Sequence, residues 1–146
     1  MRSGSYTAAT AAATSLLAGQ WSLDIEKIPE DERPRAVTIA FAPAAGGRWH
    51  TVVTVETPGG ALMKAESTAA LDGVSVPVTG SMPGIDSVSL RQPDANTLVM
   101  TLGKGGQRVS TRVYTVAAHG LTMTETIVWA AEGMPQMVTT TFHRTG

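Results

Sequence analysis

Short segments rich in Val, Thr and Ile alternate with clusters of Gly, Pro, Asn and Asp along most of this chain. Such β-branched segments, each bounded by turn-forming residues, are typical of an all-β protein. Most of the breaks are only a few residues long, so neighbouring strands should pair as antiparallel hairpins. The pattern predicts strands at about residues 20–26, 35–42, 48–56, 61–71, 86–91, 97–103, 107–116, 121–130 and 137–144.

A series of sequential hairpin strands leaves two edges with unpaired backbone groups. An up-and-down barrel removes both edges by closing on itself, and a flattened sandwich is the competing architecture. We therefore expect an all-β, antiparallel up-and-down barrel of 8–9 strands over residues 19–146. Residues 1–18 are expected to form a short helix or arm, because alanine favours helix and Gly19 would end it. The first five residues, MRSGS, also resemble the remnant of an expression tag.

The side chains that face the interior depend on how each hairpin is paired, because a slip of one residue exchanges the two faces of a strand. The GKGG turn after the strand at 97–103 can pair Leu102 with Val109, and Arg112 and Tyr114 would then face outward. The inward residues of the strand at 107–116 would be Val109, Thr111, Val113 and Thr115.

The AHG turn at 118–120 leaves two registers open for the next strand. A two-residue turn would turn the threonines of this strand inward, and it would place Glu125 beside Arg112 and Tyr114 on the other face. A three-residue loop with Gly120 in the left-handed conformation is also common. It would turn another set inward: Met123, Glu125, Ile127 and Trp129. We expect the second register, because it keeps apolar residues next to apolar residues.

Glu125 then stands on an otherwise apolar stripe. A buried carboxylate needs a hydrogen-bonding partner, because desolvation disfavours its charged form. A carboxyl group in such surroundings suits a general acid or base, so Glu125 is the candidate catalytic residue if the protein is an enzyme. The structural alternative is a carboxylate paired with a neighbouring Arg or Lys, or partly exposed near the barrel mouth.

Composition argues against several classes of function. A net charge of −1 gives no basic surface for nucleic acid, and no apolar run approaches the length of a membrane span. The chain has no cysteine, so disulfides and thiolate nucleophiles are excluded. The histidines at 50, 119 and 143 lack metal-ligand spacing, and GKGGQ lacks the ending of a phosphate-binding loop. We therefore expect neither a metal nor a cofactor.

The order of turns and strands resembles a known family. GQW at 19–21 resembles the Gly-x-Trp signature of lipocalins and related calycin barrels. A closer likeness, from about residue 18 onward, is to small bacterial lipocalin-like proteins of uncharacterised function. It is carried by GQWSLDIEK, LDGVSVPVTG, DSVSL, DANTLVMTLGKGGQ and HGLTMTET. The chain departs from that family in its loops, which hold less Lys and Asp, and at Glu125, where an apolar residue or Thr is expected.

The resemblance implies an antiparallel barrel around a small, mostly apolar ligand. It implies that Trp21 plugs the closed end and that Arg144, on the last strand, packs on this indole. Small inward residues at 65, 67 and 69 would leave room inside the barrel. We expect the cavity wall and its polar anchor to comprise Phe41, Trp49, Met63, Met100, Met123, Glu125 and Trp129.

Binding of a small apolar or amphipathic molecule in this cavity is the leading function. The runner-up is a cofactor-independent isomerase or cyclase that uses Glu125 as acid or base. A third possibility is a filled barrel that acts through its outer surface, with exposed Thr-rich strands pairing in a homodimer. The segment 72–86 is either a lid or a plain connection.

Overall fold

The computed structural model describes residues 16–130 and 136–146 of the chain. Most of these residues lie in strands. The strands are β1 (Gly19–Leu23), β2 (Ala36–Ala44), β3 (Arg48–Glu56), β4 (Leu62–Ala70), β5 (Val76–Pro77), β6 (Thr79–Gly80), β7 (Ser87–Asp94), β8 (Thr97–Lys104), β9 (Gln107–Val116), β10 (Thr122–Trp129) and β11 (Gln136–Arg144). Three short 3-10 helices, η1 (Ile25–Lys27), η2 (Glu30–Glu32) and η3 (Ala45–Gly47), lie between the early strands.

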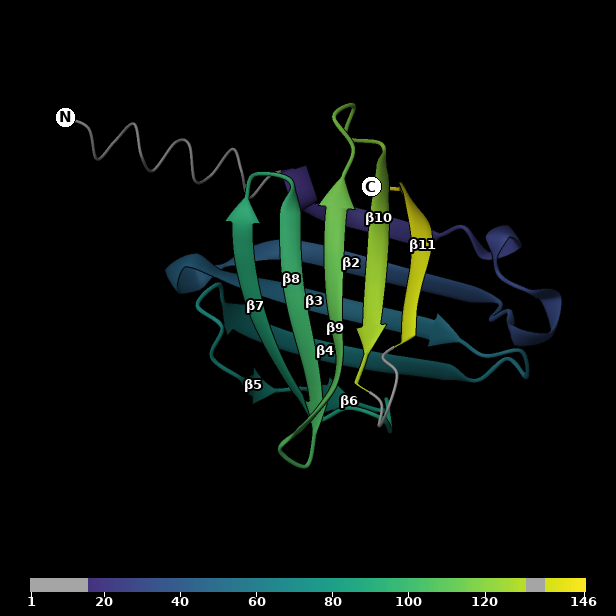
Figure 1. Cartoon of the computed structure of the whole chain (residues 1–146), viewed down its shortest axis with the longest axis horizontal. Coiled ribbons are helices and arrows are strands. Elements are labelled where there is room, and N and C mark those ends of the chain that lie inside the picture. The colour runs from purple at the N-terminus through teal and green to yellow at the C-terminus, as the bar shows by residue number, and fades with distance from the viewer. Residues whose placement is uncertain (1–15, 131–135) are drawn as a thin grey trace.

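All the strands belong to one antiparallel sheet in the order β5-β7-β8-β9-β10-β11-β1-β2-β3-β4-β6. The first strand pairs with the last, and Trp21 on β1 lies opposite Arg144 on β11. The sheet is strongly twisted, so that β7 to β10 cross in front of β2 to β4 (Figure 1). This architecture confirms the predicted all-β antiparallel barrel.

A short segment closes the remaining gap between β4 and β7. Its two strands are separated only by Val78, yet β5 pairs with β7 and β6 pairs with β4, at opposite ends of the sheet order. We call residues 76–86 the closing segment. On the β4 side the backbone N–H of Ser81 donates to the carbonyl of Lys64 at 2.8 Å. On the β7 side Val76 lies opposite Val88. The closing segment therefore supplies partners to two strand edges that would otherwise lack them.

The predicted number of strands was wrong. The described part of the chain contains eleven strands rather than 8–9, and the difference includes β5 and β6 in the predicted 72–86 connection. Segments of two residues carry no periodicity that a sequence pattern could reveal. Most of the short helix or arm expected over residues 1–18 lies outside the described residues. Of the part that is described, Leu16 and Leu17 are helical.

The predicted register between β8 and β9 was also wrong. Leu102 lies opposite Ser110 rather than Val109, and the pairing shifts between Leu102 and Gly103. Val109 is the additional residue of a β-bulge, which exchanges the faces of the rest of β9. Consequently Arg112 and Tyr114 face inward.

The predicted inward face of β10 is confirmed by the burial of Met123, Glu125 and Ile127. The expected register between β9 and β10 was wrong, because Glu125 lies opposite Tyr114, as the two-residue turn would place it. The loop itself is longer than either proposed turn: Ala117 donates its backbone N–H to Thr122, which leaves four residues at 118–121. The chain thus combines the β10 face that we expected with the grouping of Arg112, Tyr114 and Glu125 that belonged to the rejected register.

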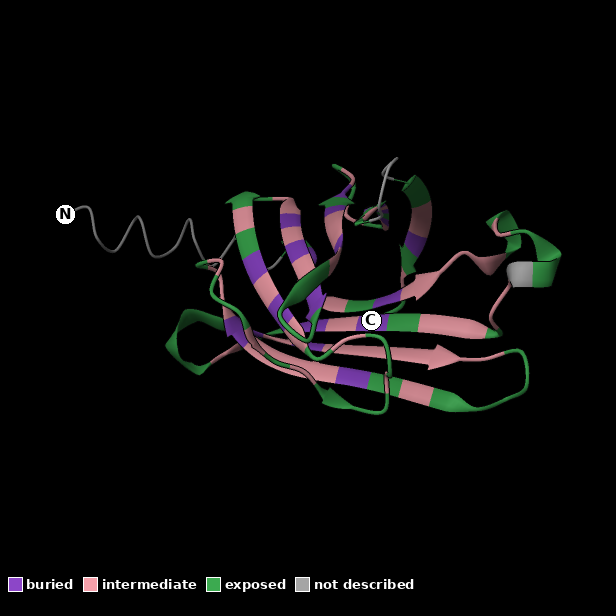
Figure 2. Cartoon of the chain, turned by 60° about the horizontal axis from the view of Figure 1, so that its bottom comes forward, coloured by how far each residue is buried: buried purple, intermediate pink, exposed green. Residues whose placement is uncertain are grey.

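The interior is densely packed toward one end of the barrel. The indole of Trp21 is fully buried and donates from Nε1 to the carbonyl of Leu17 at 3.0 Å. The guanidinium of Arg144 lies 4.2 Å from the centre of this ring and also donates to the carbonyl of Ala18 at 2.7 Å. Buried positions alternate with more exposed ones along the strands, and the hairpin tips are exposed (Figure 2).

Candidate functional site

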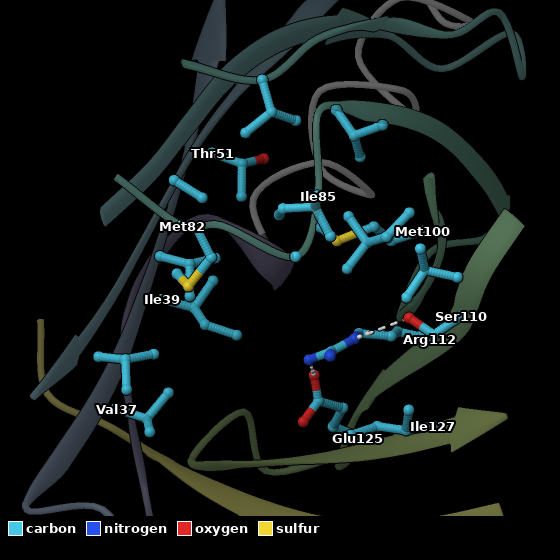
Figure 3. Close-up of a pocket in the computed structure, with 18 of the residues that line it drawn as sticks. Val37, Ile39, Thr51, Met82, Ile85, Met100, Ser110, Arg112, Glu125 and Ile127 are labelled. Atoms are coloured by element: carbon cyan, nitrogen blue, oxygen red, sulfur yellow. Dashed lines mark hydrogen bonds and ion pairs between the residues drawn. The ribbon is translucent and has the colours of Figure 1, made fainter. Parts of the chain in front are cut away.

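A cavity of about 500 Å³ occupies the other part of the interior (Figure 3). Most of its lining is aliphatic, from β2, β3, β4, β8 and the closing segment. Its apolar members include Leu23, Val37, Ile39, Val53, Val55, Met63, Ala65, Val78, Met82, Ile85, Met100, Ile127 and Trp129. Its polar members are Thr51, Ser67, Ser110, Arg112, Tyr114, Glu125 and Thr140.

Glu125 is at the centre of a hydrogen-bonded polar cluster built by the strand register. It lies directly opposite Tyr114 on β9 and Thr140 on β11, so both neighbours can reach its carboxylate. The Tyr114 hydroxyl donates to Oε2 at 2.5 Å, and the Thr140 hydroxyl donates to Oε1 at 3.0 Å. Arg112 completes the set with an ion pair from Nη1 to Oε2 at 3.2 Å. Glu125 is only 4% exposed, and these three donors replace the water that it loses on burial.

Tyr114 remains protonated over the physiological pH range. Burial raises the pKa of its phenol well above the usual value, and the neighbouring negative charge of Glu125 raises it further. Its ring packs edge-on against Phe41, with 5.7 Å between ring centres. Tyr114 is therefore a fixed hydrogen-bond donor to Glu125.

Arg112 is the member of the polar cluster with unused hydrogen-bonding capacity. Its Nε donates weakly to Ser110 at 3.4 Å, and the guanidinium carbon lies 5.5 Å from the centre of the Trp129 ring. Within the described part of the chain, Nη2 has no hydrogen-bond partner. The side chain is 23% exposed and reaches into the cavity (Figure 3). Its two Nη2 protons are thus placed where a bound molecule could accept them.

The residues that we expected to form the wall fall into two groups. Met63, Met100, Glu125 and Trp129 line the cavity. Phe41, Trp49 and Met123 are buried outside the cavity lining, in the packed end. Of the small residues expected inside, Ala65 and Ser67 line the cavity. Ala69 is instead buried in the core next to Trp49, its partner across the β3–β4 pair.

The sequence interpretation missed Arg112, Tyr114, Ser110 and Thr140 as parts of the site. A signal was present for two of them, because residues two apart on a strand share a face and the alternative register had grouped Arg112 and Tyr114 with Glu125. The β-bulge that turns them inward has no pattern of its own in the GKGGQRV stretch. Thr140 resembled any other threonine of the exposed Thr-rich rows.

The closing segment forms one wall of the cavity. Val78, Met82 and Ile85 all contribute to the lining. The segment 72–86, which was predicted as either a lid or a connection, connects β4 to β7 and contributes these side chains to the cavity wall. Lys64 fixes the β4 side of it, because its backbone N–H donates to the Ser81 hydroxyl at 3.0 Å.

No family model, curated protein or solved structure matches this chain. The antiparallel, nearly closed barrel is compatible with a calycin-like fold. Within residues 16–130 and 136–146, no helix is long and apolar enough to cross a membrane.

Proposed function

We propose that this protein is a lipocalin-like binding protein that holds a small, mostly apolar molecule in its barrel cavity. The observation that carries this proposal is the mainly aliphatic cavity of about 500 Å³ with one polar cluster on its wall. Sites for small molecules usually have volumes of about 300–1,000 Å³, a mainly apolar lining and few polar groups that fix orientation.

Burial of apolar ligand surface would supply most of the affinity. A ligand that buries roughly 250 Å² of apolar surface gains about 6 kcal/mol before the costs of association are subtracted. Inward-facing Val53 and Val55 are only half-buried, so a ligand would cover apolar surface that the fold itself leaves uncovered. The Arg112–Glu125 pair would orient the ligand rather than supply its affinity.

The alternative function, a cofactor-independent isomerase or cyclase, would use Glu125 as general acid or base. The geometry favours binding over this alternative, because three donors already hold the Glu125 carboxylate and leave it one of its roughly four lone pairs, on Oε1. A base must have a lone pair directed at the proton that it removes. A binding protein should tolerate Glu125→Gln with a modest loss of affinity, whereas an acid–base enzyme should lose about 10²-fold or more of its turnover.

The test of binding uses a neutral solvatochromic dye, Nile red, with the purified protein. Val53→Trp places an indole in the cavity, and Val52→Trp places the same side chain on the outer face of the same strand. We expect the dye to bind the wild type and the Val52→Trp variant, and to bind Val53→Trp at least about 10-fold more weakly. Equal binding by both variants, or none by the wild type, would contradict the proposal. Native mass spectrometry of the same preparations would detect a co-purified ligand.

A further inference from the structure

The polar cluster carries a prediction about ligand chemistry that rests on the proposed function. We propose that the cavity selects a neutral molecule with a hydrogen-bond acceptor, such as the carbonyl of a ketone or an amide, over a carboxylate. The acceptor would bind Nη2 of Arg112, and the aliphatic body would fill the space toward β2, β3 and the closing segment.

The first reason is charge. Arg112 and Glu125 are the only charged side chains among the described residues that line the cavity, and they are paired at 3.2 Å. Their charges compensate each other. A carboxylate bound to Nη2 would add an uncompensated negative charge to an aliphatic cavity, and it would share one guanidinium with the Glu125 carboxylate.

The second reason is the balance of donors and acceptors. The carboxylate of Glu125 already accepts from Arg112, Tyr114 and Thr140, and the proton of Tyr114 is directed at Glu125. The free donors of the cluster therefore belong to the Arg112 guanidinium and include both Nη2 protons. The Arg112 side chain is 23% exposed in the free protein, and a plain hydrocarbon that covered it would leave these donors without a partner. Such a loss is costly, so a ligand that offers an acceptor binds better at this point than a hydrocarbon does.

The third reason is that the donor is held in place before the ligand arrives. The Arg112 side chain is restrained by Glu125 on one edge, by Ser110 at Nε and by the nearby ring of Trp129. In Figure 3 the guanidinium and the Glu125 carboxylate face the aliphatic residues Val37 and Ile39 across the cavity. A donor with a fixed direction favours an acceptor at a fixed distance from an apolar body.

The experiment compares three molecules with the same alkyl chain: 2-undecanone, decanamide and decanoate. Each displaces Nile red from the intact protein at pH 7.5, where decanoate is ionised. We expect the wild type to bind the ketone and the amide at least about 10-fold more tightly than decanoate. Tighter or equal binding of decanoate would overturn this inference but leave the proposed function intact. Failure of all three to bind, in a protein that also fails to bind the dye, would instead overturn the proposed function.

Two variants locate the preference in the ion pair. Glu125→Gln leaves Arg112 without its counter-charge, so decanoate should bind at least about 10-fold more tightly than to the wild type while the ketone changes little. The double variant Arg112→Met/Glu125→Gln leaves no unpaired charge and serves if the single variant fails to fold. It should bind the ketone about 5-fold or more weakly than the wild type does. Unchanged ketone affinity in a folded double variant would contradict a role for Nη2.

Discussion

The two ends of this barrel are built from the same strands but filled in different ways. At the packed end, β3 and β4 direct Trp49 and Ala69 inward, and both are fully buried. At the hollow end the same strands direct Val55 and Met63 inward, and these side chains are only half-buried because they line the cavity. Large aromatic rings span the interior at one end, whereas aliphatic side chains leave its centre empty at the other.

This difference separates stability from binding within one sheet. The packed end contains the core that the fold needs, including ring contacts of Phe41 with Trp49 and with Tyr114. The hollow end gives up apolar burial, which a ligand can restore. A molecule that binds only the folded state should therefore stabilise the protein in proportion to the logarithm of its concentration.

The largest expected effect comes from removing the aromatic plug of the packed end. Trp21→Ala should lower the free energy of unfolding by about 3–5 kcal/mol, because it leaves a cavity and removes the hydrogen bond to Leu17. Trp129→Ala at the hollow end should cost about 1 kcal/mol or less, since this side chain is only half-buried. Urea unfolding of both variants measures the difference. Equal losses would show that the two ends contribute alike to stability.

Two Ala→Leu substitutions on β4 test the comparison by adding side-chain volume at each end of the barrel. Ala69→Leu should lower stability by about 1–3 kcal/mol, because Ala69 is fully buried beside Trp49 in the packed end. Ala65→Leu, four residues away on the same face, should change stability little and weaken dye binding, because its side chain enters the cavity. Thermal unfolding and Nile red titration of both proteins give the result. A loss of stability in Ala65→Leu equal to that in Ala69→Leu would count against an open cavity.

Gly80 tests whether dye binding at the hollow end depends on the attachment of the closing segment to β4. Gly80 has φ +122°, and an added Cβ would collide with the backbone carbonyl of Lys64. Gly80→Ala should therefore weaken the β4–β6 pairing, lower stability by about 1–2 kcal/mol and speed dye entry. Gly84→Ala is the control, since nothing lies within 4 Å of its Cβ position. Equal rates of dye binding in both variants, measured by stopped flow, would show that the β4–β6 pairing does not control access to the cavity.

The smallest effect concerns Tyr114, which touches both ends through Phe41 and Glu125. Burial, and then the charge of Glu125, raises the pKa of this phenol in the folded protein. The hydrogen-bonded phenol contributes fully to the free energy of unfolding below about pH 10, which is the pKa of tyrosine in the unfolded chain. This contribution is lost as the pH rises from there through the pKa of Tyr114 in the folded protein. The loss has a limiting slope of about 1.4 kcal/mol per pH unit. Urea unfolding between pH 8 and 11 should show that Tyr114→Phe, although less stable at neutral pH, lacks this alkaline loss. An identical slope in the variant would assign the loss to other groups.

The sequence by itself determined the class of fold and most of the strand positions. β-branched segments between Gly and Pro clusters depend on local chemistry, and each was visible without knowledge of its partners. The inward face of β10 was also predictable, because alternation places Met123, Glu125 and Ile127 on one side.

Only the tertiary structure decided which residues meet at the site. One extra residue, Val109, reversed the face of β9, and thereby brought Arg112 and Tyr114 to Glu125. Likewise, Trp49 and Met63 resembled each other as apolar wall residues, but one is buried in the core and the other lines the cavity. The physical reason is that periodicity specifies a face within a strand, whereas bulges and closure set how faces from distant strands align.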